Sequence, residues 1–131
     1  MKIIIIGCGK VGLTLAELLS AEKHDVVLID ESSQKLSSIP EELDALRILG
    51  NGASVNIQQE ADLLIAVTGS DELNLLCCLI AKKAGNCHTI ARVRNPIYNK
   101  EIGFIKEKLG ISMIINPELT AATEISRLLR F

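Results

Sequence analysis

Aromatic residues are scarce in this chain, and neither sign of charge prevails. Its 131 residues include no Trp, one Tyr and two Phe, and 14 Lys and Arg stand against 16 Asp and Glu, for a net charge of −2. The chain therefore lacks both the aromatic platforms that stack on bases and the basic surface that attracts nucleic acid. Long apolar runs are also missing, since none approaches the roughly 20 residues of a membrane span. We expect no nucleic-acid partner and no direct membrane insertion.

Cysteine is present, but its spacing fits neither a disulfide framework nor a metal site. Cys8, Cys77, Cys78 and Cys87 include no Cys-x-x-Cys pair. Cys77 and Cys78 are neighbours on a predicted helix, where successive side chains point about 100° apart and cannot chelate one ion together. We interpret the four as small buried residues in a reducing compartment, which predicts a cytoplasmic protein.

The rest of the sequence alternates short apolar runs with helical periodicity. Aliphatic runs without polar alternation predict strands buried on both faces at residues 3–6, 26–30, 46–49, 63–68, 89–93 and 112–115. Helical spacing predicts helices from residue 11, over 32–39, over 71–85, through 95–109 and from 117 onward. Because strands that alternate with helices form a parallel sheet, we predict one α/β domain over residues 1–131. It is a doubly wound, Rossmann-type sheet of six parallel strands with helices on both faces.

A glycine motif follows the first predicted strand directly. Residues 7–12 match Gly-x-Gly-x-x-Gly and open the first predicted helix. In this motif the first glycine makes a tight turn, the second lets a diphosphate approach the backbone, and the third lets the helix lie close to the strand. The diphosphate then binds the free N–H groups at the helix N-terminus. The predicted phosphate-binding residues are Gly7, Cys8, Gly9, Lys10, Val11 and Gly12.

Asp30 ends the second predicted strand, 18 residues after Gly12. A carboxylate at this position accepts hydrogen bonds from the two ribose hydroxyls and repels a 2′-phosphate. We therefore predict that Asp30, with Glu31 beside it, binds NAD(H) or a plain adenosine nucleotide such as ATP or ADP, and disfavours NADP. The residues leave the choice between dinucleotide and mononucleotide open.

Two further turns follow predicted strands at the same edge of the sheet. Ligands of such sheets bind beyond the carboxyl ends of the strands. The turn after the third strand would border the adenine, and the turn after the fourth would border the second half of a dinucleotide or the distal phosphates. The predicted cofactor-binding residues of these turns are Asn51, Gly52, Ala53, Thr68, Gly69 and Ser70.

Residues for catalysis are harder to find. Six strands occupy nearly the whole chain and leave no region for a substrate domain. Tyr98 is followed four residues later by Ile102, so a Tyr-x-x-x-Lys dyad is absent, and neither His24 nor His88 ends a strand beside an acid. We expect no enzyme activity. Two alternatives stay open: the NAD-binding half of a dehydrogenase whose catalytic domain is absent from these residues, and a structural protein that kept the fold without the ligand.

Longer segments resemble one known family. Residues 1–12, 66–74, 90–98 and 114–118 are similar to segments of the RCK (regulator of K⁺ conductance) N-terminal domain, also called the TrkA N-terminal domain. The Thr-x-Ser-Asp-Glu-x-Asn segment that begins at Thr68 and the Ala-Arg-Val-x-Asn-Pro-x-Tyr segment that begins at Ala91 are far more specific than the glycine motif. The resemblance spans essentially all 131 residues.

The resemblance implies a cytosolic regulatory domain of a potassium uptake system or K⁺ channel that binds NAD(H) or ATP/ADP and catalyses no reaction. It implies homodimers that assemble into rings at the inner face of the cell membrane, attached through a transporter subunit, with nucleotide exchange changing the shape of the ring. By the same resemblance, Arg92 would face the nucleotide, and Glu118 would help to place a metal ion between the nucleotides of a dimer.

Two departures from the family and the end of the chain carry further expectations. The connection over residues 54–62 is shorter than usual, and loss of a helix there would expose apolar surface or loosen the adenine edge of the site. Asn51 stands where aspartate is common, which removes one negative charge near the adenosine. Residues 118–130 are amphipathic and the sequence ends in an apolar turn over 128–131, so we expect a piece of a longer protein that dimerises through its C-terminal helices.

Overall fold

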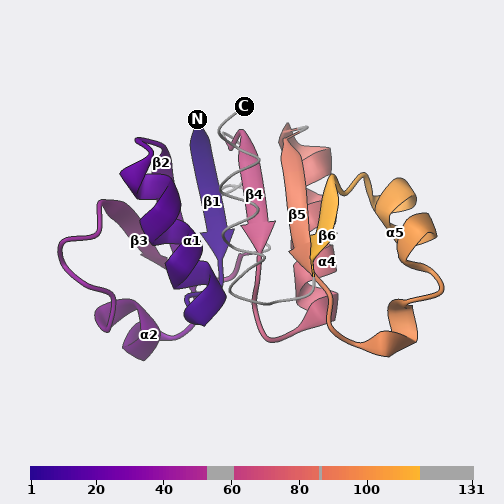
Figure 1. Cartoon of the computed structure of the whole chain (residues 1–131), viewed down its shortest axis with the longest axis horizontal. Coiled ribbons are helices and arrows are strands. Elements are labelled where there is room, and N and C mark those ends of the chain that lie inside the picture. Colours follow the sequence, from indigo (N-terminus) through magenta and orange to yellow (C-terminus); the bar gives the residue numbers. More distant parts are fainter. Residues whose placement is uncertain (53–60, 86, 116–131) are drawn as a thin grey trace.

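The computed structural model describes residues 1–52, 61–85 and 87–115 as a sheet between two layers of helices (Figure 1). The strands are β1 (Lys2–Ile6), β2 (Asp25–Asp30), β3 (Ala45–Leu49), β4 (Leu63–Ala66), β5 (His88–Arg92) and β6 (Met113–Ile115). The helices are α1 (Lys10–Ala21), α2 (Ser33–Ser37), α4 (Asp71–Gly85), the short 3₁₀ helix η1 (Pro96–Tyr98) and α5 (Ile102–Leu109). Within these residues, no helix has the length and apolar character needed to cross a membrane.

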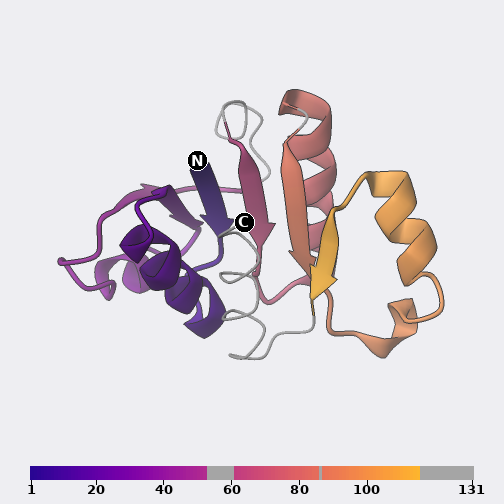
Figure 2. The ribbon, with the colours of Figure 1, turned by 45° about the horizontal axis from the view of Figure 1, so that its top comes forward.

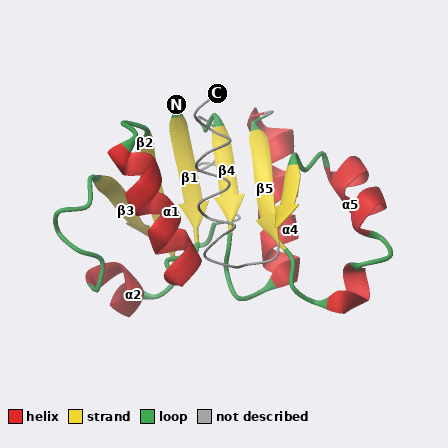
Figure 3. Cartoon of the chain, in the orientation of Figure 1, coloured by secondary structure: helices red, strands yellow, loops and turns green. Residues whose placement is uncertain are grey.

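The sheet has the order β3-β2-β1-β4-β5-β6, and every pairing in it is parallel, so the strand arrows run in one sense (Figure 3). β1 lies at the centre and pairs with β2 on one side and β4 on the other. The chain reverses its direction of progress across the sheet at this point, and a crevice for a ligand opens beyond the carboxyl ends of two such strands. The predicted doubly wound fold is confirmed.

The aliphatic strands are buried on both faces, which explains their lack of polar alternation. Ile3 and Ile5 belong to a core cluster with residues of α1, and Leu36 of α2 packs against it. Ile4 and Ile6 belong to a second cluster with residues of α4, which lies across the sheet from α1 in both views (Figures 1 and 2). At the edge strand β3 the cover is incomplete, and Leu46 is 61% exposed.

Three predicted element boundaries were wrong. β4 ends at Ala66 instead of residue 68, because the N–H of Thr68 bonds to the side chain of Asn74 instead of a neighbouring strand. The stretch 95–109 is not one helix, because Asn95 caps the short η1 through the N–H of Ile97 at 3.0 Å and α5 begins separately. The helix predicted over 32–39 is shorter, since Ser32 caps α2 instead of belonging to it.

The predicted helix from residue 117 and most of the connection over 54–62 lie outside the described residues.

Gly12 lies where α1 passes closest to the loop after β1, and a Cβ at this position would overlap the carbonyl oxygen of Gly7. We expect Gly12→Ala to lower the free energy of unfolding by about 1–3 kcal/mol, because overpacking outweighs the roughly 1 kcal/mol by which alanine favours a helix. Urea unfolding measures this. The matched control is Gly103→Ala in α5, where a Cβ meets open space, so alanine should be neutral or stabilising. A Gly12→Ala variant as stable as Gly103→Ala would contradict the proposed overlap.

All four cysteines are buried in the core, as predicted, and their side chains are free thiols. Burial raises the pKa of Cys8 and of Cys77 from the ordinary value of 9.0 to about 11 each. Burial also raises the pKa of Cys78 and of Cys87. The thiols are therefore protonated, poorly reactive core residues at neutral pH.

Because the folded protein holds these thiols neutral, its stability should depend on alkaline pH. Below about pH 8 both states keep the protons. As the pH rises from about 9 towards 11, the unfolded chain loses protons that the folded chain retains, so the free energy of unfolding should fall. Urea midpoints between pH 7 and 10.5 measure the decline. In Cys78→Ala the decline should be shallower, and an identical slope in the two proteins would contradict the assignment to thiols.

Candidate functional site

A cavity of about 270 Å³ opens at the carboxyl edge of the sheet, where β1 and β4 diverge. It is bounded by the start of the loop after β1 and by the ends of β2, β4 and β5. Its lining consists of Gly7, Gly9, Asp30, Glu31, Lys35, Val67, Thr68, Gly69, Leu73 and Arg92. Seven of the predicted cofactor-binding residues are among them: Gly7, Gly9, Asp30, Glu31, Thr68, Gly69 and Arg92.

The glycine loop combines a crowded and an open position. Gly7 has a positive φ of 107°, and a Cβ there would lie 2.9 Å from the carbonyl group of Val67. Gly9 is different, because a Cβ there would meet no atom of residues 1–52, 61–85 and 87–115 within 4 Å. α1 begins directly afterwards, and no side chain of the described residues caps its N-terminus. Its first turn contains no acidic residue. Free N–H groups and open space therefore coincide at the mouth of the cavity, which is the arrangement that binds phosphate.

Asp30 joins the glycine loop to the end of β2. One carboxylate oxygen accepts the N–H of Cys8 at 2.8 Å, and the other accepts the N–H of Ser32 at 2.8 Å. Each oxygen can accept a further hydrogen bond, because a carboxylate has about four acceptor positions. The side chain is thus fixed in direction while it still has acceptors to offer to a pair of hydroxyl groups.

Arg92 reaches the cavity from the end of β5. Its Nη1 donates to the carbonyl oxygen of Val67 at 3.3 Å, while its Nε is buried and has no hydrogen-bond partner among the described residues. Burial lowers the pKa of Arg92, and the nearby Arg94 guanidinium lowers it further, against an opposing effect of Asp71. A buried donor without an acceptor is unfavourable. An anion in the cavity would relieve both the missing hydrogen bond and the repulsion between the two arginines.

The other predicted residues of the glycine loop lie around the cavity. The side chains of Cys8 and Val11 belong to the core, so only their backbones are available to a ligand. Gly12 is buried against Gly7, and Lys10 is exposed in the first turn of α1, away from the cavity lining.

The turns after β3 and β4 contribute fewer residues to the cavity lining than predicted. Asn51 is exposed, Gly52 packs against Ile6, and neither lines the cavity. Ser70 lines a neighbouring cavity instead. Ala53 and Glu118 lie outside the described residues. No group of three or more His, Cys, Asp or Glu that could hold a metal ion occurs in the part of the chain that the structure describes.

The sequence reasoning missed Lys35 and Leu73, which line the cavity from α2 and α4. Lys35 could have been found, because it sits in the short helix that directly follows Asp30 and Glu31. It also missed Asp71 and Asn74, two buried polar residues in the first turn of α4. The sequence pattern that could have indicated them is their position after the end of a predicted strand, in the first turn of a predicted helix.

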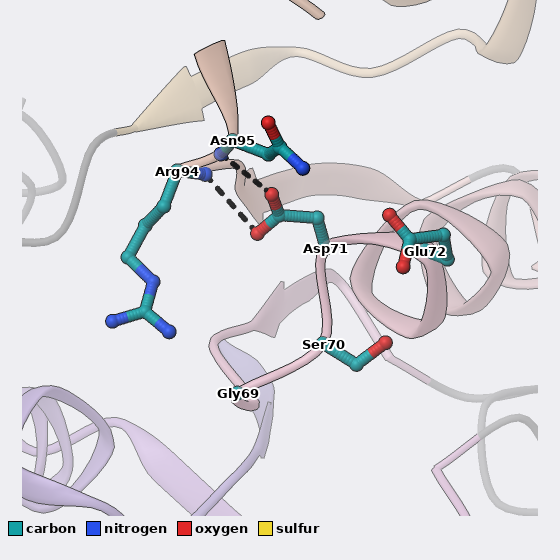
Figure 4. A pocket seen from close by; sticks show the side chains of 6 residues that line it. All are labelled: Gly69, Ser70, Asp71, Glu72, Arg94 and Asn95. Carbon is teal, nitrogen blue, oxygen red and sulfur yellow. Dashed lines mark hydrogen bonds between the residues drawn. The ribbon is translucent and has the colours of Figure 1, made fainter. Parts of the chain in front are cut away.

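A second cavity, of about 470 Å³, adjoins the first and is lined by Gly69, Ser70, Asp71, Glu72, Arg94 and Asn95 (Figure 4). Gly69 lines both cavities. The carboxylate of Asp71 accepts the backbone N–H groups of Arg94 at 3.1 Å and of Asn95 at 2.7 Å, while the Arg94 side chain extends away from it (Figure 4). The start of α4 is thereby bound to the loop after β5.

Two exposed contacts add to this attachment. The Ser70 hydroxyl accepts the N–H of Leu73 at 3.1 Å and so caps α4. Tyr98 donates its hydroxyl to Glu72 at 2.6 Å, and this hydrogen bond raises the pKa of Tyr98. The first turn of α4 therefore connects the cavity beside Gly69 with the segment over residues 94–98.

Asp71 is 8% exposed and uses both carboxylate oxygens as acceptors of backbone N–H groups. We expect Asp71→Asn to lower the free energy of unfolding by about 2 kcal/mol, because the amide turns a donor towards one of the two N–H groups and leaves it unsatisfied. Chemical denaturation gives the value. Glu72→Gln, the neighbouring exposed substitution, should change it by less than about 0.5 kcal/mol. Equal effects of the two substitutions would show that the Asp71 contacts contribute little.

Comparison with known proteins adds to this geometry. A family model described as the TrkA-N domain matches residues 3–117. The chain is 40% identical to a Trk system potassium uptake protein TrkA homolog of Methanothermobacter thermautotrophicus, an alignment that covers 98% of this chain and 60% of that protein. It is 39% identical to the Trk system potassium uptake protein TrkA of Haemophilus influenzae, over 100% of this chain and 30% of that protein. The chain thus spans less than two thirds of the length of these relatives.

Solved structures share the fold. The TrkA-N domain of the inner membrane protein ybaL from Escherichia coli superposes with a TM-score of 0.74 at 24% identity, covering 98% of this chain and 96% of that one. The GsuK channel bound to NAD superposes with a TM-score of 0.72 at 20% identity, over 87% of this chain and 21% of that one. GsuK bound to ADP gives a TM-score of 0.71 at 20% identity, over 88% and 31% of the two chains.

Proposed function

Because the chain belongs to the TrkA-N domain family, we propose that it is the nucleotide-binding regulatory domain of a potassium transport protein. The observation that carries the proposal is the cavity between β1 and β4, where the open position at Gly9, the uncapped α1 and the carboxylate of Asp30 meet. These three features together suit one ligand class, an adenosine nucleotide with a diphosphate.

The nucleotide is NAD(H) or ATP/ADP. Its ribose hydroxyls would bond to the free acceptor positions of Asp30, with Glu31 beside it, and its phosphates would lie along Gly7 and Gly9 against the start of α1. The guanidinium of Arg92 contacts Val67 at the end of β4, which is about two strand spacings, or roughly 10 Å, from β2. A diphosphate that begins at the ribose would pass the glycine loop and supply the acceptor that the Arg92 Nε lacks. Neighbours solved with NAD and with ADP support both ligands.

NADP should bind less well than either. Its 2′-phosphate would replace a hydroxyl beside Asp30 and Glu31, and the repulsion between phosphate and carboxylates opposes binding. Lys35 lines the same cavity and offsets part of this repulsion. Two carboxylates against one ammonium leave the balance in favour of the unphosphorylated ribose.

The wider role follows from the names of the relatives, which are potassium uptake proteins. We propose a cytoplasmic domain that binds its own copies in a dimer or ring and contacts a membrane potassium transporter or channel subunit at the inner face of the membrane. It is one domain of a longer protein, and nucleotide exchange alters ion flux without any chemical step. Glu118 as a metal ligand between two nucleotides belongs to the same proposal. The dehydrogenase alternative has only the shared fold in its favour.

The direct test is calorimetric titration of the protein with ADP, ATP, NAD⁺, NADH and NADP. We expect binding of the first four ligand types and at least about tenfold weaker binding of NADP, a difference of 1.4 kcal/mol. Gly9→Val should weaken binding of ADP and NAD⁺ by at least about tenfold, because its side chain fills the space left for the phosphates, at a position where a Cβ meets no atom of the described residues within 4 Å.

Gly103→Val is the matched control, since a Cβ at Gly103 also meets open space and lies in α5, outside the cavity. This variant should bind ADP as the unmodified protein does. Absence of binding by the unmodified protein for every nucleotide would overturn the proposed function, and undiminished binding by Gly9→Val would overturn the placement of the phosphates.

A further inference from the structure

We propose that Asn74 is a positioning residue that holds the two loops on the β4 and β5 side of the nucleotide cavity in their binding arrangement. The inference rests on the proposed nucleotide site and extends it to a residue that does not line the cavity. Asn74 lies in the first turn of α4 and is 0% exposed. A polar side chain that is fully buried requires hydrogen-bond partners, and the partners of this one belong to both loops.

The carbonyl oxygen of the Asn74 side chain accepts hydrogen bonds from the turn after β4. It accepts the backbone N–H of Thr68 at 2.9 Å and the Thr68 hydroxyl at 2.6 Å. The Thr68 hydroxyl in turn accepts the N–H of Ser70 at 3.2 Å. Thr68 and Gly69 line the cavity, so this oxygen fixes the cavity wall opposite the glycine loop.

The Asn74 amide nitrogen serves both loops. It donates to the carbonyl oxygen of Arg92 at 2.9 Å and to that of Thr68 at 3.2 Å. The amide therefore uses two acceptor and two donor positions, which is its full capacity. An aspartate lacks the donors and a leucine lacks both functions, so neither could replace it. The side chain takes the place of strand pairing where β4 has already ended.

The same bonds determine how Arg92 meets the cavity. Its carbonyl oxygen is held by Asn74, and its Nη1 is held by Val67, the residue before Thr68. The contacts thus form a closed cycle: Arg92 bonds to Val67, Val67 is followed by Thr68, and Asn74 bonds to both Thr68 and Arg92. The buried Nε of Arg92, which lacks a partner among the described residues, is thereby kept at the cavity. Loss of the amide releases both the Thr68 turn and the backbone from which Arg92 extends.

The test measures ADP affinity by calorimetry in Asn74→Ala and, as a second variant that keeps a polar group in the buried position, Asn74→Ser. The titrations are made well below the melting temperature, so that the native fraction is close to one and a loss of stability alone does not weaken binding. We expect at least a tenfold loss of affinity in both variants. Cys78→Ala is the matched control, because Cys78 is also 0% exposed, lies one turn further along α4 and packs away from the cavity. It should lose stability and keep its affinity.

A double-mutant cycle with Arg92→Gln separates positioning from a general structural role. If Asn74 acts largely through Arg92, the combined variant should bind ADP with a loss clearly smaller than the product of the two single losses. Fully multiplicative losses would overturn the positioning of Arg92 by Asn74, and unchanged affinity in the Asn74 variants would overturn the positioning role as a whole, while the nucleotide site stands. If the unmodified protein binds none of ADP, ATP, NAD⁺ and NADH, the proposed function fails and this inference fails with it.

Discussion

The site depends on how closely α1 approaches the loop that follows β1. Neither Gly7 nor Gly12 has room for a Cβ, because the Val67 carbonyl group fills the space at the first and the Gly7 carbonyl oxygen fills it at the second. The two exclusions fix the start of α1 at the carboxyl end of β1, beside β4. Gly9, between them, is left with open space, and the N-terminus of α1 is left without a cap. Close packing at Gly7 and Gly12 thus leaves space at Gly9, beside the N–H groups that begin α1.

The β4 and β5 side of the cavity is maintained by a different kind of interaction. Asn74 and Asp71 are buried, and their hydrogen bonds hold the Thr68 turn, the end of β5 and the loop at Arg94 and Asn95. Buried polar groups contribute to stability when all of their partners are present, and are costly when one is lost. The cavity wall at Gly7 and Gly12 therefore has no room for added side-chain atoms. The wall that α4 holds depends instead on single polar side chains, and loss of one of them would disturb it.

This difference also explains what could be predicted from the sequence. The strands and the positions of Gly7, Gly9 and Asp30 follow from local patterns, since each depends on a few neighbouring residues. The parallel pairing follows from the alternation of strands and helices along the chain. Asn74 could not be assigned in the same way, because its role depends on which strand ends become neighbours in space. The error at the end of β4 has this origin, because the Asn74 side chain ends the strand early. The error within residues 95–109 is local, because the Asn95 side chain caps η1 through the N–H of Ile97 and so separates η1 from α5.

The charges of the cavity complement one ligand along its length. Asp30 and Glu31 at the end of β2 provide acceptors for hydroxyl groups, whereas Arg92, three strand positions away, provides donors for an anion. A nucleotide that satisfies both ends must contact the glycine loop on one side and the Thr68 turn on the other. A ligand shifts a conformational equilibrium only by its difference in affinity for the two states. Because these walls are held by separate interactions, a ligand that bridged them would favour the arrangement in which both are in place. The helix α4 that holds one of these walls also bonds to the segment after β5, through Asp71 and Glu72.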